Sequence, residues 1–492
     1  MHRILLNGVL AILCPALFAA TIDPLVRTVD MNIGDATTIQ LSDGSKARLK
    51  LLNLAEQLDS VTAAVRRAVV TVEVNGMRSE LVSGTYNLPR EIGGVQIDCS
   101  VTKGYLAKGS PGSFGLKKDA RLRLWPKGSP WIRPDTFTYP AKQRWFATDT
   151  QMANDPVYVD GGERPAKKKV YYHTGLDIGG SEGLVQIVSA VDGLVVSAAG
   201  ETLPEHRRDT PVSPRYDVVY LLDDRGWYYR NSHLKTIDPD IKPGVRVKQG
   251  QRLGTLGKEG GSGGWTHLHF EAKSRQPSGE WGTQEGYAFL WQAYLAEHKP
   301  RVIAVARPHH LLWTGESVTL DASKSWADGK IAKYAWTFGD GTMAKGKQVK
   351  RTYSTPGRHS EILKVTDTDG NVSYDFAVVI VYDRDHPERH VTTVHPNYHP
   401  TSGIRVGDPI TFKVRSFISG QSREGYEVWN FGDGSSPVKV RSDGNAVKLA
   451  PDGYAEHVHR FEKAGNYVVR VQRKNEFGVV ATGHLWVHVL PK

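Results

Sequence analysis

Five residues of the types that bind metals or transfer protons are concentrated in three short motifs of this chain. The first motif, "YYHTGLDIGG" at 171–180, places His173 four residues before Asp177 and ends in two glycines, which disfavour a helix. In an extended strand, side chains four residues apart lie on one face, so the imidazole and the carboxylate can converge. Taken alone, such a pair is more typical of a protein surface than of a metal site.

The other two motifs change that balance. In "GGSGGWTHLHFEAK" at 260–273, His267 and His269 alternate with a leucine and a phenylalanine. A strand would therefore turn both imidazoles to one face and both apolar side chains to the other. Between the motifs, His233 ends another strand-like run, "WYYRNSHL". Imidazoles and a carboxylate behind a glycine-rich loop suit a zinc site with an open coordination position.

In this order and spacing, the three motifs resemble the lysostaphin family of zinc metallopeptidases, which cleave peptide crosslinks in bacterial cell walls. The family pattern is HxxxD, a histidine before leucine, and HxH followed by Phe-Glu, and the similarity covers about residues 165–275. The resemblance implies an antiparallel β-sheet peptidase domain that holds one Zn²⁺. It also implies the role of each residue: His173, Asp177 and His269 bind the metal, and His233 and His267 are catalytic.

The same resemblance implies hydrolysis of a peptide bond by a zinc-activated water that two histidines assist. Three protein ligands leave a fourth zinc position for water, and zinc can lower the pKa of that water from 15.7 to about 7. His233 and His267 would orient the water, stabilise the oxyanion and move protons to the leaving amine. No H-E-x-x-H occurs in the chain, so the histidines must carry this work. Asn231, where the family commonly has an aromatic residue, bears on the shape of the local groove rather than on the chemistry.

The elements that must position these residues are mainly β-strands. A chain of 492 residues is too long for one core and indicates three or four domains. Hairpin signals such as "SDG" and "NG" predict a small β domain of unknown role over 21–135, with one helix around 51–68. The peptidase domain is expected over 136–299. Apolar residues at helical spacing before Pro300 predict that it closes with a helix in "YAFLWQAYLAEHKP".

The C-terminal part contains a duplicated segment. "YAWTFGDGT" and "EVWNFGDGS" share a tryptophan (Trp336 and Trp429), a phenylalanine and the quartet FGDG, each 93 residues apart. These copies resemble polycystic kidney disease (PKD) repeats, although the family's aspartate after the tryptophan is a threonine in one copy and an asparagine in the other. The resemblance implies two immunoglobulin-like β-sandwiches, at 300–384 and 385–492, which act as spacers or bind a polysaccharide or protein ligand.

Several polar residues of this C-terminal part have alternative interpretations. The stretch "DHPERHVTTVHPNYHP" contains four histidines among prolines: His386, His390, His395 and His399. We interpret it as a hydrated linker, with a second metal site as the alternative. Asp340 and Asp433, in the two Gly-Asp-Gly turns, are candidates for calcium, but a lone turn is a far weaker signal than a full calcium loop.

The N-terminus and the composition bear on location and partners. Residues 1–20 carry Arg3 and an apolar run that ends in small residues, which is typical of a secretory signal peptide, with an uncleaved anchor as the alternative. We therefore expect an exported protein in the periplasm, at the cell surface or outside the cell. After signal removal no membrane span remains, and Cys99 is the one cysteine left. The charge of +11 favours polyanions such as bacterial envelopes, but no basic helix or zinc-finger spacing points to nucleic acid.

Three functions remain open. The first is a secreted zinc metalloendopeptidase that hydrolyses peptidoglycan crosslinks. The second keeps this chemistry but acts on glycine-rich extracellular proteins, and the third is a non-catalytic envelope-binding protein in the fold of a peptidase. The N-terminal domain suits either an inhibitory pro-segment or a wall-binding module, and nothing in its sequence decides between them.

Overall fold

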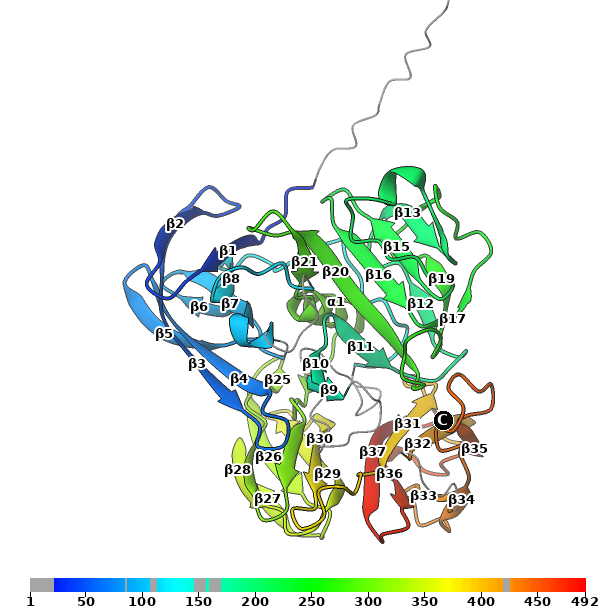
Figure 1. Cartoon of the computed structure of the whole chain (residues 1–492). Helices are drawn as coiled ribbons and strands as arrows, with labels where there is room; N and C mark the ends of the chain where they lie inside the picture. Colours follow the sequence, from blue (N-terminus) through cyan, green and yellow to red (C-terminus); the bar gives the residue numbers. More distant parts are fainter. Residues whose placement is uncertain (1–21, 85, 107–112, 146–155, 159–169, 419–424) are drawn as a thin grey trace, which may run out of the picture.

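The computed structural model describes residues 22–492 except 85, 107–112, 146–155, 159–169 and 419–424. The expected signal peptide lies outside the described residues. The described chain is mainly β, with a single α-helix, as the sequence predicts (Figure 1). No helix within these described ranges is long and apolar enough to cross a membrane.

The N-terminal part consists of two four-stranded antiparallel sheets that share one core. Their strand orders are β1-β8-β7-β6 and β2-β3-β4-β5. The strands are β1 (Arg27–Met31), β2 (Ala36–Gln40), β3 (Lys46–Leu58), β4 (Val65–Val74), β5 (Met77–Val82), β6 (Arg90–Ile92), β7 (Val95–Thr102) and β8 (Ala120–Pro126). Leu49 and Val72 from one sheet meet Ile97 and Leu122 from the other in the buried core, because alternate side chains of each strand face inward.

The prediction of a helix around 51–68 is wrong. This segment forms the end of β3 and the start of β4, joined by a turn in which the Asp59 carboxylate accepts two backbone N–H bonds. Alternate residues from Ala47 to Leu51 are buried, and the β-branched run "VVTVEV" in β4 favours a strand. Cross-strand pairing and burial against the second sheet therefore outweigh the helix propensity of the segment.

The segment predicted to be the peptidase domain, called the peptidase segment below, is built on an eight-stranded antiparallel sheet with a smaller three-stranded sheet beside it. The large sheet has the main order β11-β20-β16-β15-β13-β14, and the small one has the order β12-β19-β17. The strands of the large sheet are β11 (Leu176–Gly179), β13 (Gly193–Ala198), β14 (Glu201–Thr202), β15 (Val219–Leu222), β16 (Tyr228–Ser232), β18 (Arg246–Val247), β20 (His267–Arg275) and β21 (Trp281–Gln284). Those of the small sheet are β12 (Gln186–Val188), β17 (Leu234–Ile237) and β19 (Arg252–Leu256).

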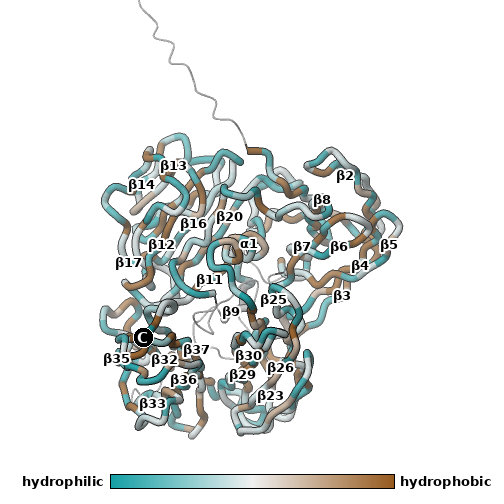
Figure 2. Tube along the Cα trace, turned by 180° about the vertical axis from the view of Figure 1, so that it is seen from behind, coloured by the Kyte–Doolittle hydropathy of each residue, from teal (hydrophilic) through white to brown (hydrophobic). Residues whose placement is uncertain are grey.

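The closing helix predicted from the sequence is confirmed as α1 (Tyr287–His298). It lies in the middle of the molecule (Figure 2), where Phe289, Leu290 and Trp291 are buried in the core of the peptidase segment. Trp125 of β8 belongs to the same core. Arg123, also in β8, is buried against Asp98 and donates a hydrogen bond of 2.6 Å to the carbonyl of Glu285, just before the helix. The N-terminal part is therefore packed directly onto the peptidase segment.

Both C-terminal copies fold as β-sandwiches. Trp336 and Trp429 are fully buried, and Phe338 and Phe431 lie in the same two cores. The first sandwich contains β22 (Val302–Ile303), β23 (His310–Trp313), β24 (Ser317–Asp321), β25 (Trp326–Ala327), β26 (Ile331–Thr337), β27 (Met343–Lys345), β28 (Gln348–Thr352), β29 (Gly357–Asp367) and β30 (Val372–Tyr382). The second contains β31 (Thr393–His399), β32 (Ile410–Phe417), β33 (Glu427–Asn430), β34 (Val438–Val440), β35 (Ala455–His459), β36 (Gly465–Lys474) and β37 (Val480–Val489).

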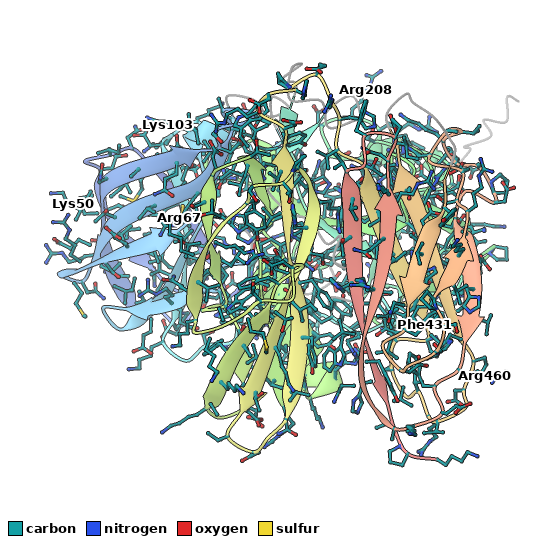
Figure 3. The ribbon with its side chains drawn as sticks, turned by 90° about the horizontal axis from the view of Figure 1, so that it is seen from below. Lys50, Arg67, Lys103, Arg208, Phe431 and Arg460 are labelled. Carbon is teal, nitrogen blue, oxygen red and sulfur yellow. The ribbon has the colours of Figure 1, made fainter. Side chains whose placement is uncertain are left out.

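The two sandwiches share a sheet. The start of β29 pairs in parallel with the start of β37, through Gly357 and Arg358 on one side and Val480 and Ala481 on the other. A nine-stranded sheet therefore runs from one sandwich into the other, and Figure 3 shows the two side by side. The basic residues labelled there belong to different parts of the molecule: Lys50, Arg67 and Lys103 to the N-terminal part, Arg208 to the peptidase segment and Arg460 to the second sandwich.

The prediction of a hydrated linker between the sandwiches is wrong for most of this segment. His395 and His399 belong to β31, where both are half-buried, and His390 is buried, whereas His386 is exposed. The strand order β31-β32-β35 puts β31 at the edge of its sheet, where prolines are tolerated because one side of the strand needs no N–H donors. The prolines that suggested a linker are compatible with an edge strand.

A buried histidine at the contact between the sandwiches makes their stability dependent on pH. His484 of β37 stacks on Phe376 of β30, with ring centroids 5.5 Å apart. Burial, reinforced by Arg470 and Arg358, lowers the pKa of His484 to about 3. An unfolded histidine has a pKa of about 6.5, so below that pH the unfolded state takes up a proton that the folded state refuses. Stability is therefore lost as the pH falls from about 6.5 towards 3.

We predict that His484→Phe removes part of this acid sensitivity. At pH 5 the wild type should lose about 2 kcal/mol of unfolding free energy relative to pH 7 through this residue alone. Urea unfolding at both pH values measures the loss, with His386→Gln as an exposed control. Equal losses in the wild type and His484→Phe would contradict the prediction.

Candidate metal and catalytic site

Three of the five site residues come together through the pairing of β11 with β20. Asp177 lies directly opposite His269, and Gly179 lies opposite His267. Paired residues in neighbouring strands project to the same face, so Asp177, His267 and His269 share one face of the sheet. The alternating residues Leu268 and Phe270 are buried in the core on the other face. The two faces of the sheet are therefore divided as the sequence pattern predicts.

Three potential metal-binding atoms converge at this place. His269 Nδ1 lies 2.9 Å from Asp177 Oδ1 and 3.1 Å from His173 Nε2, and His173 Nε2 lies 3.2 Å from Asp177 Oδ1. In a tetrahedral zinc site with bonds of 2.0–2.1 Å, ligand atoms lie about 3.3 Å apart. Over the part of the chain that the structure describes, this is the one group of three such residues close enough to hold a metal. The donor set therefore fits zinc.

The charges of the cluster also favour a cation. All three residues are buried. Burial opposes the ionisation of Asp177, but His173 and His267 hold the pKa of its carboxyl well below the usual range. Burial likewise opposes protonation of His173, but the carboxylate of Asp177 raises its pKa. A buried carboxylate requires positive charge nearby, and a metal ion supplies it without protonating the imidazoles.

His233 is brought to the site by the end of β16 and held there by backbone and side-chain contacts. It has a left-handed backbone conformation, with φ of 68°, and its N–H donates to the Asp217 carboxylate at 3.0 Å. Its Nδ1 lies 2.6 Å from the carbonyl oxygen of Glu259. A Cβ at Gly257 would lie 2.7 Å from the His233 carbonyl oxygen, so this close approach requires glycine.

His267 has a matching arrangement. Its Nδ1 lies 3.1 Å from the carbonyl oxygen of Trp265, and its ring centroid lies 4.6 Å from that of His233. A carbonyl oxygen can only accept, so Nδ1 carries the hydrogen in both histidines and each Nε2 keeps its lone pair. Burial lowers the pKa of His233, and lowers that of His267 well below the usual range. Both rings are thus neutral and can accept a proton at Nε2.

Three further residues support the site and were missed in the sequence. Glu271 lies on the same face of β20 as His269, with 3.7 Å between its Oε2 and His269 Nε2, and strand alternation could have identified it. Asp217 precedes β15. No local pattern in the sequence links this residue to His233. Trp265 stacks on His267, with ring centroids 3.8 Å apart, and no local sequence pattern indicates this contact.

Asn231 does not shape the groove, contrary to the sequence-based expectation. It is fully buried and lies opposite Phe270 in the pairing of β16 with β20. Since paired residues share a face, Asn231 points to the core side of the sheet, away from the histidines. The neighbouring aromatic residues Tyr228 and Tyr229 are buried as well.

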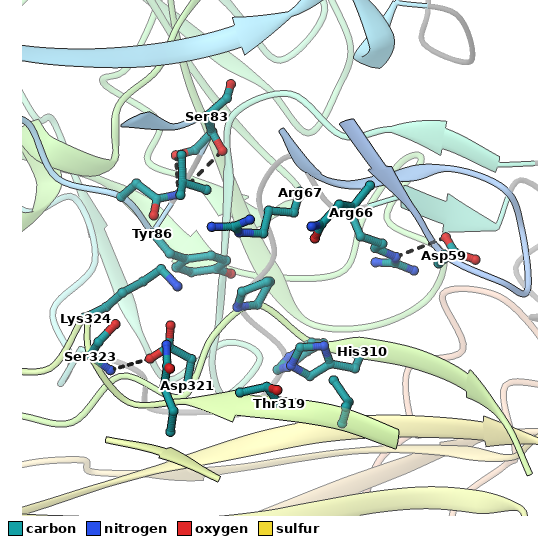
Figure 4. Close-up of a pocket in the computed structure, with 18 of the residues that line it drawn as sticks. Asp59, Arg66, Arg67, Ser83, Tyr86, His310, Thr319, Asp321, Ser323 and Lys324 are labelled. Atoms are coloured by element: carbon teal, nitrogen blue, oxygen red, sulfur yellow. Dashed lines mark hydrogen bonds and ion pairs between the residues drawn. The ribbon is translucent and has the colours of Figure 1, made fainter. Parts of the chain in front are cut away.

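Other polar regions of the described structure do not combine the residue types found at this site. A cavity of about 1180 Å³ lies between the N-terminal part and the first sandwich, but none of the five site residues lines it. One of its arginines, Arg66, already pairs with Asp59 (Figure 4), with 3.2 Å between Nε and Oδ2. The two Gly-Asp-Gly carboxylates are also engaged, Asp340 with Arg351 and Asp433 with His459.

Comparison with known proteins identifies two of the domains. Residues 171–279 match Peptidase family M23, and residues 298–381 match the PKD domain. The chain therefore contains an M23 peptidase domain, followed by a PKD domain. The resemblance to the lysostaphin family is thus confirmed, as is that of the first C-terminal copy to PKD repeats, whereas the PKD likeness of the second copy stays a prediction. The five site residues all lie within the peptidase match.

Individual relatives share only parts of the chain. Collagenase ColQ1 of Bacillus cereus (strain Q1) is 30% identical over 131 residues, which are 26% of this chain and 13% of the collagenase. Helicobacter pylori Csd3, in its orthorhombic crystal, is 15% identical with a TM-score of 0.20, over 54% of this chain and 82% of that chain. A carbohydrate-binding module of the β-sandwich superfamily is 17% identical with a TM-score of 0.16, over 39% of this chain and 92% of that chain.

We predict that Glu271→Gln weakens zinc binding about 10- to 100-fold, the usual cost of removing a carboxylate that supports a metal-binding histidine. Burial opposes the ionisation of Glu271, but Lys273, at 3.5 Å, holds its pKa below the usual range, so the native residue offers His269 a negative charge. Competition with a chromogenic chelator measures the affinity. The exposed Glu280→Gln is the control, and equal affinities in all three proteins would exclude this role.

Proposed function

We propose that this chain is a zinc metalloendopeptidase that hydrolyses peptide bonds in peptidoglycan crosslinks. The observation that carries the proposal is the convergence of His173, Asp177 and His269 beside two neutral imidazoles, inside a domain that matches a peptidase family. These three residues hold the metal, and His233 and His267 are catalytic. When bound, zinc lowers the pKa of a water molecule and polarises a substrate carbonyl.

The two catalytic histidines account for the proton transfers. Hydrolysis adds water across the C–N bond: the water oxygen bonds to the carbonyl carbon, and one water proton passes to Nε2 of His233 or His267. When the C–N bond breaks, the imidazolium returns a proton to the leaving nitrogen, giving a carboxyl and an amine. The low pKa of His267 favours this return. Because the rings lie 4.6 Å apart, one can move the proton while the other orients the reacting groups.

The remaining expectations belong to the same proposal. The chain is exported after removal of residues 1–20, to the periplasm, the cell surface or the medium. The peptidase domain extends over 136–299, and both sandwiches are PKD-like, with a polysaccharide or protein as a ligand. For the N-terminal part, residues 21–135, we keep both alternatives: an inhibitory pro-segment or a wall-binding module.

A second substrate class has a specific observation in its favour. The relative with 30% identity is named a collagenase, and collagen is rich in glycine. We therefore keep the same site chemistry on a glycine-rich extracellular protein as the second candidate function. A non-catalytic envelope protein is the remaining alternative.

We predict that His267→Ala retains zinc and lowers kcat about 10²- to 10⁴-fold, since it removes a proton-transfer group and leaves the three ligands in place. Asp177→Ala should lose both zinc and activity. Release of peptides from isolated peptidoglycan and cleavage of gelatin are measured in parallel, with His386→Ala as the control. Turnover of gelatin alone would select the second substrate class. Zinc binding without turnover of either substrate would favour the non-catalytic alternative.

A further inference from the structure

The second sandwich reaches into the peptidase site through the Gly-rich loop, defined as residues 257–266 between β19 and β20. We propose that this sandwich is a positioning element of the site: by holding the Gly-rich loop, it fixes the tautomer and orientation of both His233 and His267. This inference rests on the proposed catalytic role of those two histidines. The sandwich would then be part of the catalytic unit rather than a spacer.

The Gly-rich loop carries the hydrogen-bond acceptors of both catalytic rings. The carbonyl of Glu259 lies against Nδ1 of His233, and the carbonyl of Trp265 lies against Nδ1 of His267. The Trp265 indole also stacks on the His267 imidazole, with centroids 3.8 Å apart and planes at 19°. The conformation of one loop therefore sets both rings.

The loop has little conformational stability of its own. Five of its ten residues, 260–264, form the run Gly-Gly-Ser-Gly-Gly, and Gly260, Gly263 and Gly264 have positive φ values of 61°, 71° and 91°. Glycine loses more backbone entropy on ordering than any other residue. Within the loop, the Ser262 hydroxyl donates to the Lys258 carbonyl and accepts from the Gly264 N–H at 3.1 Å. Contacts from neighbouring elements add to these two bonds in holding the loop in one conformation.

Backbone groups of the loop are bound by the second sandwich. Arg415 of β32 is fully buried, binds Asp443 through two hydrogen bonds of 2.7 and 2.8 Å, and donates a third to the Gly264 carbonyl. Asn445 donates to the Gly263 carbonyl at 3.3 Å. An arginine oriented by a bidentate carboxylate is a rigid donor, so it fixes the loop carbonyl in place.

Thr266, next to His267, is bound from both sides. Its N–H donates to the hydroxyl oxygen of Tyr454 at 2.9 Å, and its hydroxyl donates to the Gly180 carbonyl at 2.6 Å. Asn397 of β31 donates to the Thr266 hydroxyl oxygen at 3.3 Å. The second sandwich is therefore connected at once to the start of β20 and to the end of β11, the two strands that carry the site.

A row of rings completes the connection. His395 of β31 packs edge-on against Trp265, with centroids 5.3 Å apart, and Phe417 of β32 packs against His395 at 4.4 Å. These contacts form a continuous row of rings from the sandwich into the site, namely Phe417, His395, Trp265 and His267. Small displacements of a catalytic group reduce rates strongly, so an imidazole held against the Trp265 indole is an advantage for turnover.

Hydrogen exchange tests the contact without reference to activity. In the full chain, Tyr454→Phe removes the acceptor of the Thr266 N–H and keeps the aromatic ring. We expect the peptide spanning 258–266 to exchange at least about 10-fold faster, because local opening becomes easier. Tyr467→Phe, in the same sandwich but bonded to Lys463, is the matched control and should leave this peptide unchanged. Unchanged exchange in Tyr454→Phe would overturn the proposal, whatever the enzyme does.

Kinetics test the consequence for the histidines. Trp265→Ala should lower kcat about 10- to 100-fold with KM and zinc content unchanged, and Trp265→Phe, which still stacks, should restore most of it. Loss of zinc or of the folded state in both variants would mean that Trp265 is merely structural. A full kcat in Trp265→Ala would exclude the positioning role. If the wild type hydrolyses no substrate, the proposed function fails, and the exchange experiment still decides whether the sandwich holds the loop.

Discussion

The buried carboxylate of Asp177 is the constraint on which the site depends. A carboxylate taken out of water must be compensated by nearby positive charge or hydrogen-bond donors. Asp177 meets this requirement through His173 and His269, whose nitrogens lie 3.2 and 2.9 Å from its Oδ1. The pairing of β11 with β20 produces this proximity, because it places Asp177 directly opposite His269. In the proposed function a cation completes the charge balance, so the register of two strands determines where the metal is held.

The surrounding structure keeps this small cluster in place. Glu271 supports His269, Asp217 fixes the backbone of His233, and the carbonyls of the Gly-rich loop fix the tautomers of both catalytic histidines. Each of these supports lies outside the five residues to which we assign the chemistry. The second sandwich in turn contacts the loop, so residues more than a hundred positions away in the sequence contribute to the geometry of the site.

The sequence predicted the parts of this arrangement that depend on local periodicity. Alternation in "HLHFE" indicated which side chains of β20 face the site, and the repeated "FGDG" indicated two sandwiches. The expected helix at 51–68 and the expected linker around His395 failed for one reason: burial and strand pairing were decided by distant partners. Contacts such as Arg415 with Gly264 or Trp265 with His395 leave no local pattern, because each joins segments that only the tertiary structure brings together.

Anomalous scattering at the zinc absorption edge, measured on crystals of the zinc-loaded protein, tests the central claim most directly. The account predicts one strong peak, about 2.0 to 2.2 Å from His173 Nε2, Asp177 Oδ1 and His269 Nδ1. Absence of a peak between these atoms, or a peak coordinated by other residues, would contradict it.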